Sequence, residues 1–328
     1  MSARRLTARH ESWPIRGSFT ISRGSVTAVE LVVVEIAAEG AVGRGECRPY
    51  ARYGESVRQT LDAIEGVRGT VEAGCERDDL ATLLPAGAAR NALDCALWDL
   101  EAKLAGRPAW ELIGLPPPRP LEVSFTLGLD TPEAMAAAAV EVADRPVLKL
   151  KLGGRHDIAR VTAVRAAAPA ARLIVDANEA WTPRVYKRVA PALAELGVEL
   201  IEQPFPARED GWLDGLERWV PLCADESCHD AAGIARLIGR YEVVNLKLDK
   251  TGGLTEGLRA AMLAQARGLK LMVGCMVATS LAMAPALLLA QLGQWCDLDA
   301  PLLLAKDREP GLTYRDGMVE PPPATLWG

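Results

Sequence analysis

The sequence is poor in the residues and patterns that mark several common protein classes. Only three His occur among 328 residues, and the seven Cys form no CxxC pair. This argues against a zinc cluster and suits reduced thiols in the core of a cytoplasmic protein. There is no run of Lys and Arg, and the net charge is -6 with a pI near 5.4. These values argue against nucleic acid or an anionic membrane as a partner, so we expect a small-molecule partner.

Long apolar runs are also missing. The first five residues lead into mixed polar sequence rather than the apolar region of a signal peptide. The longest apolar stretch, 281–292, contains Pro285 and is too short to span a bilayer, so we expect a core helix there. No GxGxxG or GKS/T motif occurs, which argues against an open, doubly wound nucleotide-binding sheet.

The first third of the chain predicts a small α+β unit. Its pattern indicates a loop, a buried strand, a turn and two helices, which we place at 16–25, 26–36, 40–45, 56–71 and 88–104. The second helix is expected to be amphipathic, and Gly106 and Pro108 close it. The rigid stretch Pro116-Pro-Pro-Arg-Pro120 then ends the unit. We therefore assign residues 1–120 to an N-terminal α+β domain.

The remainder alternates short β-type runs with Ala-rich helical runs. Eight strands are expected, at 121–127, 147–152, 172–176, 198–202, 221–224, 243–247, 270–274 and 295–298. Eight such repeats are what a parallel (β/α)8 barrel of the TIM type requires. We assign residues 121–305 to this barrel and 306–328 to a C-terminal segment that returns to the first domain.

Ionisable residues gather where the expected strands end, which is where barrels of this kind carry their chemistry. They are Lys149, Lys151, Asp176, Glu202, Asp225, Lys247, Asp297 and Asp299. Lys149 and Lys151 alternate on one strand and therefore point the same way. Because like charges repel, we expect the pair to lower the pKa of at least one lysine toward that of a usable base. Lys250 lies on the exit loop, three residues after Lys247, and is expected to matter less.

Asp176, Glu202 and Asp225 on adjacent strands form a hard-oxygen site that suits Mg²⁺, with Mn²⁺ as the alternative. An ion-pair cluster with the lysines is the competing structural interpretation. Lys151 and Lys247 are four strands apart, hence on opposite sides of the mouth. Two opposed bases can remove a proton from one face of an α-carbon and return one to the other. The metal would stabilise the enediolate formed in this racemisation or epimerisation.

With these residues in place, the whole chain resembles the enolase superfamily, muconate-lactonizing subgroup, and within it the dipeptide epimerases. The superfamily uses Lys or His bases together with Mg²⁺. The segments that carry the resemblance are Gly45-Glu-Cys-Arg-Pro-Tyr50 with Tyr53-Gly-Glu, Ala96-Leu-Trp-Asp-Leu100, Lys149-Leu-Lys151, Asp176-Ala-Asn178 with Trp181, Ile201-Glu-Gln-Pro204, Ala224-Asp-Glu-Ser227, Asn245-Leu-Lys-Leu-Asp-Lys-Thr-Gly-Gly253 and Asp297-Leu-Asp299.

The resemblance implies a capping role for the N-terminal domain and specific roles for the polar residues. Asp176, Glu202 and Asp225 match the metal ligands, Lys151 and Lys247 the two acid/base residues, and Lys149 a supporting lysine. Asp297 and Asp299 match the pair that holds the α-ammonium of a dipeptide. Arg23 is a candidate partner for a substrate side-chain carboxylate, and Thr126 is a further candidate substrate-binding residue. The sequence departs from many relatives at Ala278, where they carry Glu.

The expected function is thus that of a Mg²⁺-dependent isomerase that epimerises dipeptides, with L-Ala-D/L-Glu as the leading substrate. The alternatives are an N-acyl amino acid racemase acting on N-acetylglutamate, an o-succinylbenzoate synthase or cycloisomerase, and a non-enzymatic metal-binding barrel. Opposed bases argue against the last of these, because a binding protein has no use for them. A homo-oligomer is compatible with the sequence, which does not specify its size.

Overall fold

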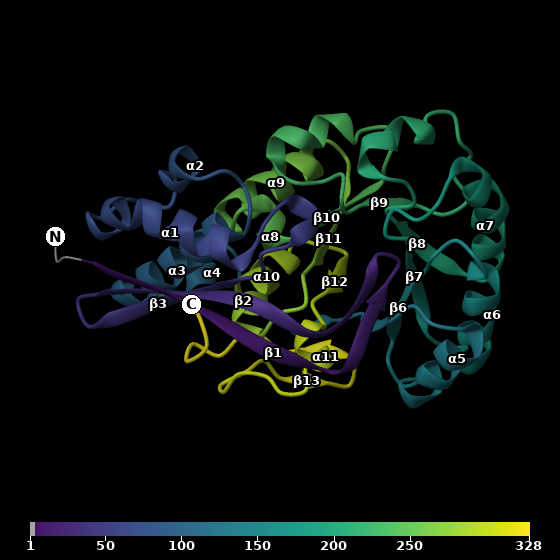
Figure 1. The fold of residues 1–328 in the computed structure, drawn as a ribbon, viewed down its shortest axis with the longest axis horizontal. Coiled ribbons are helices and arrows are strands. Elements are labelled where there is room, and N and C mark those ends of the chain that lie inside the picture. The colour runs from purple at the N-terminus through teal and green to yellow at the C-terminus, as the bar shows by residue number, and fades with distance from the viewer. Residues whose placement is uncertain (1–3) are drawn as a thin grey trace.

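The computed structural model describes residues 4–328. Its largest element is a parallel eight-stranded sheet in the order β5 to β12 (Figure 1). The strands are β5 (Phe125–Leu127), β6 (Val147–Lys151), β7 (Arg172–Asp176), β8 (Val198–Glu202), β9 (Leu222–Ala224), β10 (Val243–Leu246), β11 (Lys270–Gly274) and β12 (Trp295–Asp297). A parallel bridge between Val123 and Cys296 joins the two ends of the sheet. The sheet therefore closes, and the expected (β/α)8 barrel is confirmed.

Helices return the chain between the strands. They are α5 (Pro132–Glu141), α6 (Asp157–Ala167), α7 (Pro183–Glu195), the 3₁₀ helices η2 (Ala207–Leu213) and η3 (Ala231–Arg236), α8 (Leu248–Thr251), α9 (Leu254–Ala266), α10 (Ser280–Ala290) and α11 (Ala300–Leu303). Thr131 and Thr182 begin α5 and α7, because their hydroxyls accept hydrogen bonds from Ala134 N and Val185 N. Every residue of α10 is buried, which confirms the expected core helix. None of the helices described is long and apolar enough to cross a membrane.

The N-terminal domain is an antiparallel sheet packed against helices. Its elements are β1 (Arg5–Ile21), β2 (Gly24–Ala38), β3 (Ala41–Cys47), η1 (Ala51–Tyr53), α1 (Val57–Glu72), α2 (Leu80–Leu83), α3 (Ala88–Ala105) and α4 (Ala109–Ile113). The β1–β2 hairpin extends from this domain toward the barrel strands (Figure 1). Hydrogen bonds from Ser22 and Arg23 to Asn178 O fix its tip beside the loop that follows β7.

Two local expectations for the sheet of this domain were wrong. The proposed loop at 16–25 is mostly strand, because β1 continues to Ile21 and pairs with β2 beyond a bulge after Pro14. The proposed turn at 40–45 is confined to Glu39 and Gly40, and β3 follows at once. Gly43 lies within β3, and this position requires a glycine because a Cβ there would come within 2.1 Å of Ala96 O on α3. The glycine permits close strand-to-helix contact rather than a turn.

Helix α3 was expected to be amphipathic but is buried on almost all sides. One side packs on the cap sheet, and polar residues of the other side bind the barrel. Arg90 donates to Thr251 O (2.7 Å), Asn91 donates to Asp249 (2.8 Å), and Asp94 accepts from Thr255 Oγ1 (2.5 Å). The polar residues of α3 thus face protein rather than water. The pattern of a single sequence does not distinguish a polar helix face that contacts protein from one that contacts water. These bonds dock the cap on the α8–α9 region of the barrel.

The C-terminal segment contacts both parts of the molecule. Strands β13 (Tyr314–Arg315) and β14 (Met318–Val319) pair with β4 (Leu121–Glu122) in a small sheet of order β13–β14–β4. At the end of the chain, Trp327 Nε1 donates to Cys95 O (3.0 Å) and Gly328 N donates to Asp99 (2.7 Å). The domain boundaries at 120 and 305 remain a prediction.

Candidate active site

A cavity of about 70 Å³ lies at the C-terminal ends of the barrel strands, beneath the cap. Both domains contribute its walls. The residues that line it are Phe19, Ile21, Arg23, Arg48, Tyr50, Tyr53, Thr126, Lys149, Lys151, Asn178, Asp225, Glu226, Lys247, Cys275, Met276, Val277, Asp297, Asp299, Ala300 and Leu303. Eight of the ten candidate site residues are among them, and the other two, Asp176 and Glu202, adjoin the cavity beside Asp225. Ala278 is fully buried and does not line the cavity.

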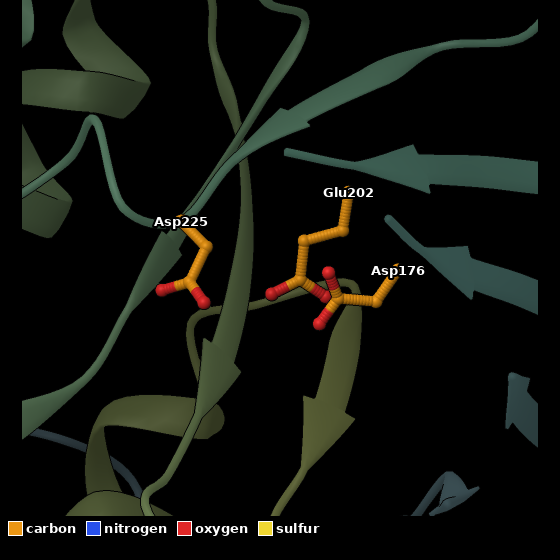
Figure 2. Close-up of side chains that lie close together, drawn as sticks. All are labelled: Asp176, Glu202 and Asp225. Carbon is orange, nitrogen blue, oxygen red and sulfur yellow. The ribbon is translucent and has the colours of Figure 1, made fainter. Parts of the chain in front are cut away.

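Asp176, Glu202 and Asp225 converge at the floor of this cavity (Figure 2). Asp176 and Glu202 are the last residues of β7 and β8, and Asp225 directly follows β9. One carboxylate oxygen from each lies within 4.8 Å of the others, and all three side chains are buried. Neighbouring parallel strands in register produce this arrangement, because Asp176 pairs with Glu202 across the β7–β8 ladder.

Amide side chains orient these carboxylates. Asn245 Nδ2 donates to Glu202 (2.8 Å), and Asn178 Nδ2 donates to Asp176 (3.1 Å). Asn178 has a φ of 43°, a left-handed conformation that Asn tolerates better than most residues. The backbone N of Asp225 is in turn held by Gln203 Oε1 (2.9 Å). The three carboxylates are therefore fixed by a hydrogen-bonded frame rather than by a flexible loop.

The donor set fits a divalent cation. Among residues 4–328, five buried side-chain polar atoms have no well-directed hydrogen bond, and four lie at this cluster. Those four are acceptor oxygens, namely Asn178 Oδ1, Glu202 Oε2, Glu226 Oε2 and Asn245 Oδ1. Glu202 Oε2 lies 2.6 Å from the ammonium of Lys149, but the other three have no donor within the described chain, and buried acceptors of this kind are costly unless a cation or water satisfies them. A cluster of carboxylate oxygens that lacks His and Cys ligands suits Mg²⁺ best.

Lys149 is fully buried among the carboxylates. Its Nζ lies 2.6 Å from both Glu202 Oε2 and Asp297 Oδ2 and 3.7 Å from Asp176 Oδ2. Burial alone would lower the pKa of Lys149, but Asp297, Glu202 and Asp176 outweigh it and hold the pKa well above its usual value. The expected lowering by the neighbouring lysine is therefore wrong for Lys149. It acts as a permanent cation that links two carboxylates.

Lys151 and Lys247 stand on opposite sides of the carboxylate cluster. Lys151 Nζ lies 2.6 Å from Asp176 on the β6 side, and Lys247 Nζ lies 2.7 Å from Asp225 on the β10 side. Both side chains line the cavity and are less than 10% exposed. The strand order places β6 and β10 four strands apart in the ring. Two amines thus face the same small space from opposite directions.

Lys250 is more closely involved than its place on an exit loop suggested. It belongs to the short helix α8, and its Nζ lies 2.6 Å from Asp225 Oδ1 and 3.1 Å from Asn245 O. Its side chain is fully buried, so Asp225 is held between two lysines. Burial raises the pKa of Asp225, but Lys247 and Lys250 together hold it well below the usual range. Because the chain forms a helical turn after Lys247, the side chain of Lys250 is directed to Asp225. The spacing of these two lysines in the sequence does not reveal this turn.

Lys250→Met should destabilise the metal-free protein by about 3 kcal/mol, because it removes one partner of a buried ion pair. Chemical denaturation in EDTA measures this change in the free energy of unfolding. Lys187→Met is the matched control, since Lys187 is an exposed residue of α7. Equal stability of the two variants would contradict a structural role for Lys250 beneath Asp225.

Asp297 and Asp299 end the barrel opposite β8, but their surroundings differ. Asp297 is already engaged, because it binds Lys149 and accepts from Ser124 Oγ (2.6 Å). Asp299 accepts from Thr126 N (2.7 Å) and forms no ion pair within the described chain. Burial and then the charge of Asp297 raise the pKa of Asp299 to about 6. Of the two, Asp299 is the carboxylate that an additional cation would stabilise more.

Arg23 lies at the tip of the β1–β2 hairpin and is already bound to protein carboxylates. Its Nη1 lies 2.8 Å from Glu226 and 3.3 Å from Glu179, and it donates to Asn178 O (3.1 Å). Arg52 holds Glu179 from the other side (2.7 Å). These contacts tie the hairpin and η1 to the barrel loops. The guanidinium of Arg23 is thus engaged before any substrate binds.

Our sequence reasoning did not select several residues that line the cavity. Glu226 directly follows Asp225, and burial followed by the charge of Asp225 raises its pKa to about 7. Arg48, Tyr50 and Tyr53 come from the cap, just after β3. The only sequence feature that included these three residues was the cap motif after Gly45. The motif indicated resemblance to the family, but it did not indicate that these side chains reach the mouth of the barrel.

Comparison with known families gives matches over both domains. Residues 3–114 match the N-terminal domain of mandelate racemase / muconate lactonizing enzyme, and residues 134–325 match the enolase C-terminal domain-like family. An L-Ala-D/L-Glu epimerase of Escherichia coli (strain K12) is 46% identical, over 94% of this chain and 96% of that protein. An N-acetyl-D-glutamate racemase of Pseudoalteromonas is 47% identical, over 91% of this chain and 95% of that protein.

Solved structures show the same similarity. An enolase family member from Agrobacterium tumefaciens with homology to dipeptide epimerases, with bound sodium and L-Ala-L-Glu, has a TM-score of 0.97 and 49% identity, over 99% of this chain and 100% of that one. The dipeptide epimerase of Enterococcus faecalis V583, complexed with Mg and L-Leu-L-Tyr, has a TM-score of 0.89 and 31% identity, over 98% of both chains.

Proposed function

Because this chain belongs to the mandelate racemase / muconate lactonizing enzyme family of the enolase superfamily, we propose that it is a Mg²⁺-dependent isomerase that epimerises dipeptides. The leading substrate is L-Ala-D/L-Glu. The observation that carries the proposal is the pair of opposed lysines, Lys151 and Lys247, on either side of a three-carboxylate site.

Asp176, Glu202 and Asp225 would hold the metal, with Asn178 and Asn245 orienting two of them. When bound, Mg²⁺ supplies Lewis-acid stabilisation of the charge that develops on the substrate carboxylate. The protein supplies the frame. The ammonium group of Lys149 offsets part of the negative charge of the carboxylate cluster, because it contacts both Glu202 and Asp297.

Lys151 and Lys247 exchange the α-proton on opposite faces of the substrate. One lysine, in its neutral form, removes the proton, and the other, as an ammonium, delivers a proton to the opposite face. In the reverse direction the two roles are exchanged. The planar intermediate is an enediolate, and the result is a 1,1-proton transfer with no net change in composition. An elimination or cycloisomerisation does not require two opposed bases.

The charges around the cavity favour a free dipeptide over an N-acylated amino acid. The substrate α-carboxylate is directed to the β7–β9 side, and the opposite side carries Asp297 and Asp299 on the segment from β12 to α11. Since Lys149 already pairs with Asp297, an α-ammonium would lie against Asp299 and next to Thr126. An acylated nitrogen offers no such cation. The similarity to an N-acetyl-D-glutamate racemase keeps that activity as the second candidate.

The proposal is tested with L-Ala-L-Glu and Mg²⁺ in D₂O. We expect L-Ala-D-Glu to appear with a single deuteron at the inverted carbon, as measured by mass spectrometry and chiral chromatography. A wider dipeptide library run in the same way would define the range of substrates. If no dipeptide acquires deuterium while N-acetylglutamate does, the N-acyl racemase assignment replaces this one.

Asp299→Asn should lower kcat/KM for L-Ala-L-Glu by more than tenfold, because it removes a charged partner of the α-ammonium, worth roughly 1.5–3 kcal/mol. The same variant should turn over N-acetylglutamate, if the wild type does so at all, with little change. Mg²⁺ affinity, measured by calorimetry, should remain close to that of the wild type. Equal losses on both substrates would show that Asp299 does not recognise an ammonium group.

We also propose a cytoplasmic location, which suits the seven free cysteines found in the structure. A homo-oligomer is a further proposal, and light scattering coupled to gel filtration measures its size. The expected ligand is the small dipeptide rather than a nucleic acid or a membrane.

A further inference from the structure

Five cationic side chains line the active-site cavity, and four of them are paired with carboxylates. The paired residues are Arg23 with Glu226, Lys149 with Asp297 and Glu202, Lys151 with Asp176, and Lys247 with Asp225. The fifth is Arg48. Across residues 4–328, no carboxylate oxygen lies within the 4.0 Å ion-pair distance of its guanidinium.

Arg48 is fixed in the cap but lacks an anionic partner. Its backbone N donates to Asp249 (3.1 Å), and its Cζ lies 5.4 Å from the ring centroid of Tyr50. No hydrogen bond of its side chain is formed within the described residues. Burial lowers the pKa of Arg48, and the weaker attractions of Tyr50 and Asp249 do not restore it. The guanidinium of Arg48 is half-buried in the cavity wall and has no carboxylate partner in the part of the chain that the structure describes, so it is free to bind an anion that enters the cavity.

The unpaired charges of the cavity form a complementary set. Asp299 is the unpaired anion on the β12 side, and Arg48 is the unpaired cation on the cap side. The ammonium of a zwitterionic dipeptide would pair with Asp299, and its α-carboxylate would bind at the metal site formed by Asp176, Glu202 and Asp225. Arg48 remains unmatched unless the substrate carries a second carboxylate.

The direction of the substrate side chain follows from the proposed chemistry. The proton moves along the line between Lys151 and Lys247, so the other three substituents of the α-carbon lie in a plane across that line. The carboxylate is directed to the β7–β9 floor and the nitrogen to the β12 side. The side chain is therefore directed at the cap, which contributes Arg48 to the cavity.

We propose that Arg48 binds the side-chain carboxylate of the residue that is epimerised, and that the enzyme prefers dipeptides with an acidic second residue for this reason. The proposal rests on the proposed dipeptide epimerase function and adds a specificity-determining residue to it. Arg23 is a separate candidate, but its guanidinium is bound to Glu226 and Glu179 in the structure.

The test compares L-Ala-L-Glu with its uncharged isostere L-Ala-L-Gln. In Arg48→Gln, kcat/KM for L-Ala-L-Glu should fall roughly 10- to 100-fold, the effect expected from losing a hydrogen bond between charged groups. The value for L-Ala-L-Gln should change less than threefold. Arg48→Lys, which keeps the charge, should recover part of the Glu preference. Arg52→Gln is the matched control, because Arg52 is a nearby cap arginine that binds Glu179 outside this cavity.

The proposal would be overturned if Arg48→Gln left the kcat/KM ratio of L-Ala-L-Glu to L-Ala-L-Gln unchanged. It would also be overturned if this ratio fell only in Arg23→Gln. A wild-type enzyme that epimerises neither dipeptide would instead overturn the proposed function. Circular dichroism and Mg²⁺ calorimetry on each variant exclude misfolding as the cause. If Arg48→Gln fails to fold, the kcat/KM ratio of L-Ala-L-Glu to L-Ala-L-Gln is compared between Arg48→Lys and the wild type instead. A wild type that does not prefer L-Ala-L-Glu over L-Ala-L-Gln would contradict the proposal.

Discussion

Replacing Lys247 by Ala is expected to stop the interconversion of the two epimers while leaving α-proton exchange with solvent on one of them. The reason is geometric, since Lys247 and Lys151 reach the site from strands on opposite sides of the barrel. Without Lys247, the epimer that presents its hydrogen to Lys151 still loses and regains it on that face. Inversion fails because no acid remains on the other face.

Lys151→Ala should show the converse, with exchange retained only on the other epimer. Incubating each pure epimer in D₂O and measuring exchange by proton NMR separates the two faces. Lys270→Ala serves as the control, because Lys270 is an exposed residue at the start of β11. Loss of exchange on both epimers in both variants would contradict the two-base arrangement and favour a single-base reaction.

Removal of the metal site is expected to have an effect of similar size. Glu202→Gln keeps the shape of the side chain but removes one of three converging charges, so Mg²⁺ should bind much more weakly. We expect activity to fall by at least roughly a thousandfold, or about 4 kcal/mol of transition-state stabilisation. EDTA should abolish wild-type activity, and added Mg²⁺ should restore it.

Calorimetry of Mg²⁺ binding distinguishes a lost metal from a damaged fold. Glu199→Gln is the matched control, because Glu199 lies on the same strand, β8, but pairs with Arg172 near the surface. Full activity in thoroughly metal-stripped protein would remove Asp176, Glu202 and Asp225 from the mechanism. Activity lost equally in Glu199→Gln would assign the effect to the stability of β8.

The Lys250 and Arg48 variants address residues whose importance is visible only in three dimensions. Lys250 follows Lys247 by one helical turn, and a loop interpretation gave it little weight. In the structure the turn of α8 brings both ammonium groups to Asp225. Similarly, Arg48 lies 128 residues before Asp176, the first metal ligand in the sequence, and only docking of the cap brings it to the cavity.

The sequence by itself determined the barrel and the residues at its strand ends. Most of the parallel strands are short runs buried on both faces, so their approximate bounds and the ionisable residues at their ends can be read locally. The strand expected at 121–127 is the exception, because Leu121–Glu122 form β4, which pairs with β14, and only Phe125–Leu127 belong to the barrel. Strand order then follows from consecutive right-handed repeats, which is why Lys151 and Lys247 could be set opposite each other before the fold was known.

Only the tertiary structure decided which charges are already paired. Lys149 pairs with Asp297, and Arg23 pairs with Glu226. Asp299 and Arg48 have no ionic partner among residues 4–328. It also decided that residues 16–21 form a strand and that α3 is buried on most sides, because both depend on surfaces contributed by distant parts of the chain. Ion pairing and burial depend on distances between segments far apart in sequence, and local residue patterns carry little information about those distances.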